Sequence, residues 1–298
     1  MTVLTPQAQA IFEAHQDLAL PTVAALTLPY TLEAPIYRAA KEACLALGFI
    51  EIDAECLARA WHARVERTGQ FQPEDWPDHP ADFSLRSFPR DNAFAPCPHK
   101  LGLYAVLPDA AWVGRMAQAG VPTVQLRFKS DNLVAVAREI RASVQAVQGT
   151  GALLFINDHW QLAIEAGAYG VHLGQEDLEL ADLQHIRTAG LRLGLSSHGY
   201  AEMLRADAFS PSYIAMGAVF ATTLKRMVTA PQGTGRLHAY ARLMCNYPLV
   251  AIGGIDASHL PDVLASGVGS VAVVRAIVAA QQPEEIAAQL QAAISSGV

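Results

Sequence analysis

From residue 101 to the C-terminus, short apolar runs alternate with stretches of helical spacing, and this alternation restricts the fold more than any other feature of the chain. Each run is too short for a buried helix and rich in β-branched or aromatic residues, so we interpret each pair as a strand followed by a helix. The predicted strands span residues 101–107, 123–129, 153–158, 170–174, 193–197, 213–220, 249–255 and 271–274. Eight such units in about 200 residues predict a (β/α)8 TIM barrel of class α/β, because a doubly wound sheet usually has fewer strands and a glycine-rich first turn.

The residues before this alternation have a different character. Residues 1–68 predict three helices, at 6–20, 33–47 and 53–68, and the last would begin with Asp53 as its N-cap. Residues 69–99 contain prolines that interrupt every helix, with four large aromatic side chains between them: Trp76, Phe83, Phe88 and Phe94. We therefore expect a helical extension (1–68), a linker (69–99) that packs on a neighbouring surface or else is disordered, and a barrel (100–298).

Charge and composition exclude several classes of partner. The net charge is −7 and no dense Lys/Arg block occurs, which argues against tracking along a nucleic acid. Although 52% of the residues are hydrophobic, no apolar run approaches the ~20 residues that cross a bilayer. The four cysteines form no CxxC pair and suit reduced thiols. We expect a cytoplasmic protein that acts on small molecules, with neither membrane nor nucleic acid as partner, and the sequence leaves open a homo-oligomer.

The predicted strand at 123–129 carries polar residues at every second position, namely Gln125, Arg127 and Lys129. Helices cover the outside of a parallel barrel, so this polar face must turn toward the barrel mouth. Two cations there favour a phosphate or pyrophosphate ligand. The alternative is a structural salt bridge to Asp158 or Glu176.

Two carboxylates, Asp158 and Asp177, each follow the end of a predicted strand, and the two strands are expected to be neighbours. Asp158 alone could be only a helix N-cap, and Asp177 only a loop charge. Together with the nearby cations they predict a site for Mg²⁺-bound pyrophosphate, because Mg²⁺ commonly uses one or two carboxylates plus phosphate oxygens and water. His172 alternates with Val171 and Leu173, and we interpret it as a supporting rather than a catalytic histidine.

The later strands end in small polar residues and glycines. Ser196 lies near the end of one predicted strand, and Thr222, Thr223 and Lys225 follow another. A Gly253-Gly254 turn at the end of the next predicted strand, before a helix, offers backbone N–H groups to an anion. These residues suit a phosphate cradle, with Lys225 as a third cation.

Residues 101 to about 294 resemble thiamine-phosphate synthases. The motifs that carry the resemblance occur in the family's order: VQLRFK, FINDHWQLAI, GVHLGQEDL, GLSSH, F-x-T-x-x-K, VAIGGI and SVAVVRAI. The resemblance implies a TIM barrel that joins hydroxymethylpyrimidine pyrophosphate to thiazole phosphate and releases pyrophosphate with Mg²⁺. It implies that Asp158 and Asp177 ligate the metal. The residues implied to contact the pyrimidine pyrophosphate are Gln125, Arg127, Lys129, Asn157, Ser196 and Lys225; those implied for thiazole phosphate are Thr222, Thr223, Leu224, Gly254, Val274 and Arg275.

Two positions depart from the family pattern. The loop that usually reads PTxTK has Leu224 in place of its second threonine, and the usual VVSAI reads VVRAI, which introduces Arg275. Both changes fall on the thiazole-phosphate side, whereas the pyrophosphate side is intact. The alternatives to a synthase are a related barrel with an altered acceptor or a thiazole tautomerase role, and a non-catalytic ligand-sensing barrel.

Overall fold

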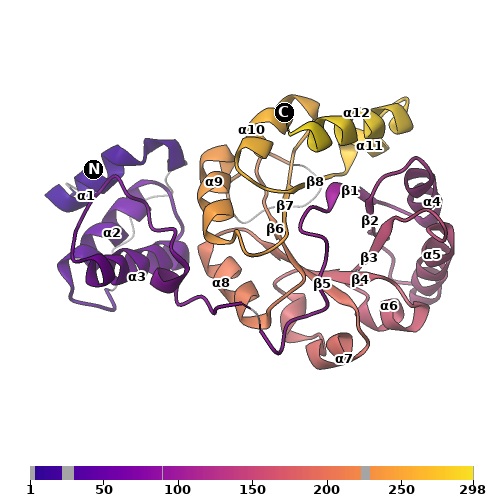
Figure 1. Cartoon of the computed structure of the whole chain (residues 1–298), viewed down its shortest axis with the longest axis horizontal. Coiled ribbons are helices and arrows are strands. Elements are labelled where there is room, and N and C mark those ends of the chain that lie inside the picture. The colour runs from indigo at the N-terminus through magenta and orange to yellow at the C-terminus, as the bar shows by residue number, and fades with distance from the viewer. Residues whose placement is uncertain (1–3, 22–29, 89, 223–228, 298) are drawn as a thin grey trace.

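The computed structural model describes residues 4–21, 30–88, 90–222 and 229–297. Within them, eight parallel strands pair in sequence order and close into a barrel, because β1 also pairs with β8, with Gly102 opposite Ser270 (Figure 1). The strands are β1 (Gly102–Leu107), β2 (Thr123–Leu126), β3 (Leu153–Asn157), β4 (Gly170–Leu173), β5 (Arg192–Ser197), β6 (Tyr213–Met216), β7 (Leu249–Ile252) and β8 (Ser270–Val273). The predicted (β/α)8 barrel is confirmed.

Helices surround the barrel, and further helices precede it within the described part of residues 4–88 (Figure 1). The barrel helices are α4 (Ala110–Gln118), α5 (Leu133–Ala146), α6 (Trp160–Ala166), α7 (Leu183–Thr188), α8 (Tyr200–Phe209), α9 (Gly233–Leu243), α10 (Leu260–Ala265), α11 (Arg275–Val278) and α12 (Pro283–Ser296). The earlier ones are α1 (Pro6–Ala14), α2 (Pro35–Ala46) and α3 (Glu51–Thr68). The short helix α11 was not predicted. Several predicted strands were too long at their C-terminal ends; β2, for example, ends at Leu126.

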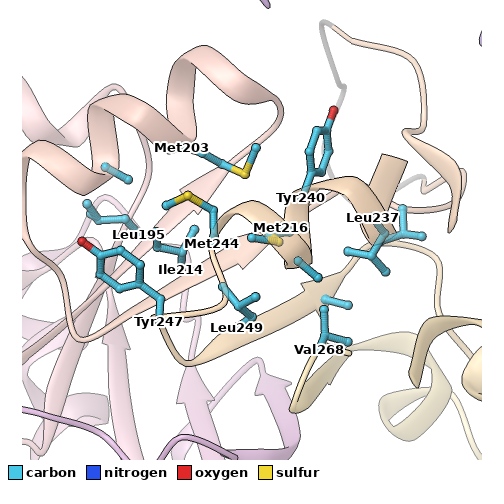
Figure 2. Packing of buried hydrophobic residues seen from close by; sticks show 14 of the residues in the cluster. Leu195, Met203, Ile214, Met216, Leu237, Tyr240, Met244, Tyr247, Leu249 and Val268 are labelled. Carbon is cyan, nitrogen blue, oxygen red and sulfur yellow. The ribbon is translucent and has the colours of Figure 1, made fainter. Parts of the chain in front are cut away.

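Period-two alternation divides the strand side chains between two buried clusters. Inside the barrel lie residues such as Tyr104, Phe155 and Tyr213. The outward-facing residues pack under the helices, where Figure 2 shows Leu195 and Ile214 among the methionines and tyrosines near α8 and α9. This outer cluster also includes side chains of α1–α3, so the extension shares a hydrophobic core with the barrel.

The extension lies beside α8 and α9 (Figure 1), and together with the linker it caps α8 at both ends. Asp53 is 3% exposed, and its Oδ1 accepts a hydrogen bond of 2.8 Å from the Ala201 N–H in the first turn of α8. At the other end, the Arg86 and Arg90 guanidinium groups donate to the carbonyl oxygens of Ala208 and Asp207 at 2.6 and 2.8 Å. Negative charge at the N-terminus and positive charge at the C-terminus both stabilise a helix.

The predicted N-cap role of Asp53 in its own helix was therefore wrong. Helix α3 begins at Glu51 with Ile50 in the capping position, and the Asp53 carboxylate caps α8 instead. The close approach needs glycine at 199, since a Cβ there would lie 2.1 Å from Asp53 Oδ2.

Part of the linker packs against the barrel, in agreement with the first of the two predicted alternatives. Trp76, Phe83 and Phe94 are buried, whereas Phe88 is 42% exposed. Near its end the linker meets the residues at the N-terminal ends of the strands: Ser212 donates to the Ala95 carbonyl at 2.6 Å. The face that these contacts cover is opposite the one where TIM-barrel sites lie.

Among the residues that the structure describes, no helix is both long enough and apolar enough to span a bilayer.

Candidate functional site

A pocket of about 740 Å³ opens at the C-terminal ends of the strands. Eleven of the residues selected from the sequence line it: Gln125, Arg127, Lys129, Asn157, Asp158, Asp177, Ser196, Thr222, Gly254, Val274 and Arg275. Thr223, Leu224 and Lys225 lie outside the described residues. Most of the site residues predicted from the sequence therefore line one cavity. Arg127 is among them, although β2 ends one residue before it, at Leu126. The backbone still continues the ladder there, because the Arg127 N–H donates to the Leu107 carbonyl at 2.8 Å.

The floor of the pocket contains a continuous chain of side-chain hydrogen bonds. Its links are Ser196 Oγ to His172 Nε2 (2.8 Å), His172 Nδ1 to Tyr213 OH (2.7 Å), Tyr213 OH to Tyr104 OH (2.8 Å), Tyr104 OH to Gln125 Oε1 (2.9 Å) and Gln125 Nε2 to Asn157 Oδ1 (2.8 Å). The chain crosses the barrel from β5 to β3. His172 has the supporting position predicted for it, whereas Val171 and Leu173 belong to the outer core.

The direction of the protons along this chain follows from its amide end. Tyr104 donates to the oxygen of Gln125, so its own oxygen must accept from Tyr213. Tyr213 in turn accepts from His172 Nδ1–H, which leaves Nε2 of a neutral imidazole as the acceptor for Ser196. Ser196 Oγ therefore has lone pairs left for a ligand.

At the other end, Asn157 uses its side-chain oxygen to accept from Gln125. Its amide nitrogen remains the group that can donate to a ligand. The floor therefore suits a molecule that donates near Ser196 and accepts near Asn157.

The two tyrosines were missed by sequence reasoning. Burial raises the pKa of both hydroxyls far above their usual value, so Tyr104 and Tyr213 act as neutral hydrogen-bonding groups. A usable signal was present, because a tyrosine at an inward-facing strand position needs a partner for its hydroxyl.

The Asp158 and Asp177 carboxylates lie near each other at the pocket mouth. Partial burial, and next the charge of Asp177, raise the pKa of Asp158, although the residue as a whole stays exposed at the mouth. Asp158 has φ = 64°, a left-handed conformation that non-glycine residues rarely adopt. It does not cap α6, whose N-cap position is His159. Asp177 is oriented by the Gly174 N–H, which donates to its Oδ2 at 2.9 Å.

These two carboxylates fit a divalent cation that completes its shell with ligand oxygens and water. Burial is the larger cause of the raised Asp158 pKa, and repulsion from the Asp177 charge adds to it; a cation between the two carboxylates would remove that repulsion. Within the described residues no group of three or more His, Cys, Asp or Glu side chains could hold a metal, so this pair would supply only part of a shell. Mg²⁺ tolerates such a partial protein set, whereas structural Zn²⁺ usually has four protein ligands.

Arg127 and Lys129 complete the electrostatics of this side. Both lower the pKa of Asp158, against the effects of burial and of Asp177. In the part of the chain that is described, no ion pair within 4.0 Å joins Asp158 to either cation, so they act on it from a distance. The arrangement concentrates positive charge beside two carboxylates, which is suited to a metal-bound polyphosphate.

The opposite wall consists of the ends of β6, β7 and β8. Gly254 has φ = 67°, and a Cβ there would lie 2.5 Å from the Ala221 carbonyl oxygen, so a side chain would disturb the wall. Arg275 is exposed and is the first residue of α11. The helix after the Gly253-Gly254 turn starts only at Leu260, after a short 3₁₀ turn.

Comparisons with known proteins agree with this geometry. Residues 103–277 match a family described as thiamine monophosphate synthase. The thiamine-phosphate synthase of Neisseria meningitidis serogroup B is 54% identical over 199 residues, which are 67% of this chain and 97% of that protein. That of Photorhabdus laumondii is 50% identical over 197 residues, 66% of this chain and 91% of that protein. A solved thiamine phosphate pyrophosphorylase from Pyrococcus furiosus has a TM-score of 0.60 and 25% identity, covering 67% of this chain and 98% of that one.

Proposed function

The chain belongs to the thiamine monophosphate synthase family, and we propose from this that it transfers the pyrimidinylmethyl group of hydroxymethylpyrimidine pyrophosphate to thiazole phosphate, with Mg²⁺ at the Asp158–Asp177 pair. The observation that carries the assignment of substrates to residues is the combination, in one pocket, of a directed hydrogen-bond chain with a mouth of two carboxylates and two cations.

The floor is complementary to an aminopyrimidine. Such a ring carries an exocyclic amino group that donates and ring nitrogens that accept. Ser196, made an acceptor by His172, would receive the amino hydrogen, and the Asn157 amide would donate to a ring nitrogen. Apolar residues such as Val106 and Ala215 line the pocket near these groups and would contact the ring faces.

The pyrophosphate would then extend toward the mouth. Arg127 suits bidentate contact with phosphate oxygens, and Lys129 adds a point charge. Lys225, which lies outside the described residues, would be a third cation. When bound, Mg²⁺ would neutralise charge on the leaving pyrophosphate.

The main catalytic role of the protein groups would be to assist the departure of pyrophosphate, and proton transfer would have little part in it. Cations fixed at the mouth stabilise the negative charge that develops on the leaving group. When the bond between the methylene carbon and the pyrophosphate oxygen breaks, the pyrimidinylmethyl group would carry the positive charge. The thiazole nitrogen would then form a bond to that carbon. The opposite wall of the pocket would hold the thiazole phosphate through Thr222, Gly254, Val274 and Arg275. Thr223 and Leu224, which the family resemblance assigns to the same substrate, lie outside the described residues. No step requires a strong general base.

The direct test is to incubate the purified protein with Mg²⁺, the pyrimidine pyrophosphate and thiazole phosphate, and to measure thiamine phosphate by chromatography. Product formation that depends on both substrates and on Mg²⁺ supports the proposal. Binding of the pyrimidine pyrophosphate without product would reject synthase activity and leave a barrel with another acceptor. No binding of either substrate would favour a ligand-sensing role.

We further propose a cytoplasmic location. The small phosphorylated substrates and four unpaired cysteines accord with a cytoplasmic enzyme. A homo-oligomer stays a prediction, which sedimentation of the purified protein would test.

A further inference from the structure

Arg236, on α9, is a barrel residue whose charged group is enclosed by the extension. The side chain is 3% exposed. Its Nε donates to the Leu18 carbonyl and its Nη2 to the Leu47 carbonyl, both at 2.9 Å. The guanidinium carbon lies 3.6 Å from the centroid of the Phe49 ring. A buried guanidinium needs such partners, since an unpaired charge in the interior is strongly unfavourable.

The third nitrogen of the same guanidinium, Nη1, contacts the barrel instead. Arg236 Nη1 donates to Gln232 Oε1 at 3.2 Å, and Tyr240 OH donates to that same oxygen at 2.8 Å. Gln232 is 5% exposed, and its Nε2 donates to the Ala230 carbonyl at 2.7 Å. The Gln232 side chain is therefore held on both its oxygen and its nitrogen.

The backbone of Gln232 is joined to the pocket wall. Its N–H donates to the Ala218 carbonyl at 2.8 Å, and the next N–H, of Gly233, donates to the Val219 carbonyl at 2.9 Å. Ala218 lines the pocket, on the β6 side. The N–H of Val219 donates in turn to the Ile252 carbonyl at the end of β7, at 3.0 Å. Polar contacts thus run without interruption from the extension to the wall.

We propose that Arg236 and Gln232 are positioning residues through which the N-terminal extension holds the β6 wall of the pocket in the shape that binds the acceptor substrate. Hydrogen bonds in a buried network depend on one another, so the loss of the carbonyl partners in the extension would reach Gln232. The name of the acceptor, thiazole phosphate, rests on the proposed function. The mechanical link from extension to wall does not.

A second contact of the extension provides a matched control. Asp53 joins the extension to α8 through the Ala201 N–H, and its charge acts on Arg236 only through space. Among the described residues, no hydrogen bond joins its carboxylate to Arg236 or Gln232. If the extension only stabilised the barrel, weakening either contact would have the same effect on the site. If it positions the β6 wall, only the Arg236 contact matters to the acceptor.

The experiment compares four full-length variants: Arg236→Met, Gln232→Leu, Gln232→Glu and Asp53→Ala. We expect Arg236→Met and Gln232→Leu to raise KM for thiazole phosphate five- to tenfold, with KM for the pyrimidine pyrophosphate changed less than twofold. Gln232→Glu keeps an oxygen for Arg236 and Tyr240 but loses the donation to the Ala230 carbonyl, so its KM for thiazole phosphate should lie between those of the wild type and Gln232→Leu. Asp53→Ala should leave both KM values within twofold.

Hydrogen exchange gives a readout that needs no turnover. Amides of residues 229–236, which include those of Gln232 and Gly233, should exchange at least fivefold faster in Arg236→Met and Gln232→Leu, and at the wild-type rate in Asp53→Ala. Equal effects of the Arg236 and Asp53 variants, or unchanged exchange in Gln232→Leu, would overturn the proposal. If Arg236→Met does not fold, the Gln232 pair decides. If the wild type makes no thiamine phosphate, the proposed function fails, while hydrogen exchange still tests the link.

Discussion

Replacement of Tyr213 by phenylalanine tests whether the hydrogen-bond chain controls substrate binding. Tyr213 is fully buried, and its hydroxyl contacts His172 Nδ1 at 2.7 Å and Tyr104 OH at 2.8 Å. Phenylalanine keeps the ring but leaves both partners buried without this bond. At ~1–3 kcal/mol for each such group, we expect a loss of about 3 kcal/mol of folding free energy. For a chain of 298 residues, with an unfolding entropy of ~2.1 cal/mol/K per residue, that corresponds to a fall in Tm of roughly 5 °C.

The effect on binding follows from the imidazole. Without Tyr213 as an acceptor, His172 can place its proton on Nε2 and donate to Ser196, whose own proton would then face the ligand. The Ser196 hydroxyl and the amino group of the pyrimidine would then both be donors, and neither would have an acceptor. We expect KM for the pyrimidine pyrophosphate to rise roughly 10- to 100-fold, equivalent to about 1.4–2.8 kcal/mol, with KM for thiazole phosphate nearly unchanged.

The matched control is Tyr200→Phe. Tyr200 is also fully buried, and its hydroxyl accepts from Trp76 Nε1 at 2.8 Å, between α8 and the linker and away from the pocket. It should lower Tm without changing either KM. Steady-state kinetics with each substrate varied in turn, together with thermal unfolding, measure both effects. If Tyr213→Phe lowers Tm and yet leaves KM for the pyrimidine pyrophosphate within twofold of wild type, the chain does not set the polarity of Ser196.

Three further substitutions test the metal pair and the junction with α8. Asp177→Asn should lower Mg²⁺-dependent kcat by about 10³-fold with the circular dichroism spectrum unchanged, because it removes one of two anionic ligands; normal turnover would exclude Asp177 from the metal site. Burial raises the pKa of Asp53 from 3.8 to about 6, so the folded state binds its proton more tightly than the unfolded state. The free energy of unfolding of the wild type, measured by chemical denaturation, should therefore rise relative to that of Asp53→Asn by up to about 3 kcal/mol as the pH falls from 7 to below 4, at 1.36 kcal/mol per pKa unit. A difference between the two proteins that does not change with pH would contradict the raised pKa. Gly199→Ala should lower Tm by several degrees, because its Cβ would lie 2.1 Å from Asp53 Oδ2, and an unchanged Tm would show that the junction can yield.

The barrel and much of its pocket could be predicted because their signals are local. Alternation of apolar and polar residues fixes which strand side chains face inward, and a parallel barrel places all strand ends at one mouth. That is enough to bring Gln125, Asn157 and Ser196 into one cavity. Errors at strand ends, such as the early end of β2, did not matter, because the chain remained extended through Arg127.

Partners that are distant in sequence could not be predicted. Tyr104 and Tyr213, whose hydroxyls form a hydrogen bond, lie 109 positions apart in the sequence. The periodicity of each strand predicts only that the side chain faces inward, and it does not identify the partner. The Asp53 prediction failed for the same reason. A carboxylate near a helix start is locally a good N-cap, but the N–H groups that it satisfies belong to a helix 148 positions later.

The extension illustrates how a barrel can come to depend on a segment that has no counterpart in a relative of 54% identity. The Neisseria relative aligns over 97% of its length with only 67% of this chain, so about a third of this chain has no counterpart there. Here, however, α8 receives its N-terminal carboxylate from α3 and its C-terminal guanidinium groups from the linker, and the Arg236 charge finds two of its acceptors in the extension. Removing residues 1–99 would leave both ends of α8 and the Arg236 guanidinium without these partners, and it would expose barrel residues that are now buried. Because the partners are polar and directional, nonspecific hydrophobic contact could not replace them, and the extension is an integral part of this barrel's structure.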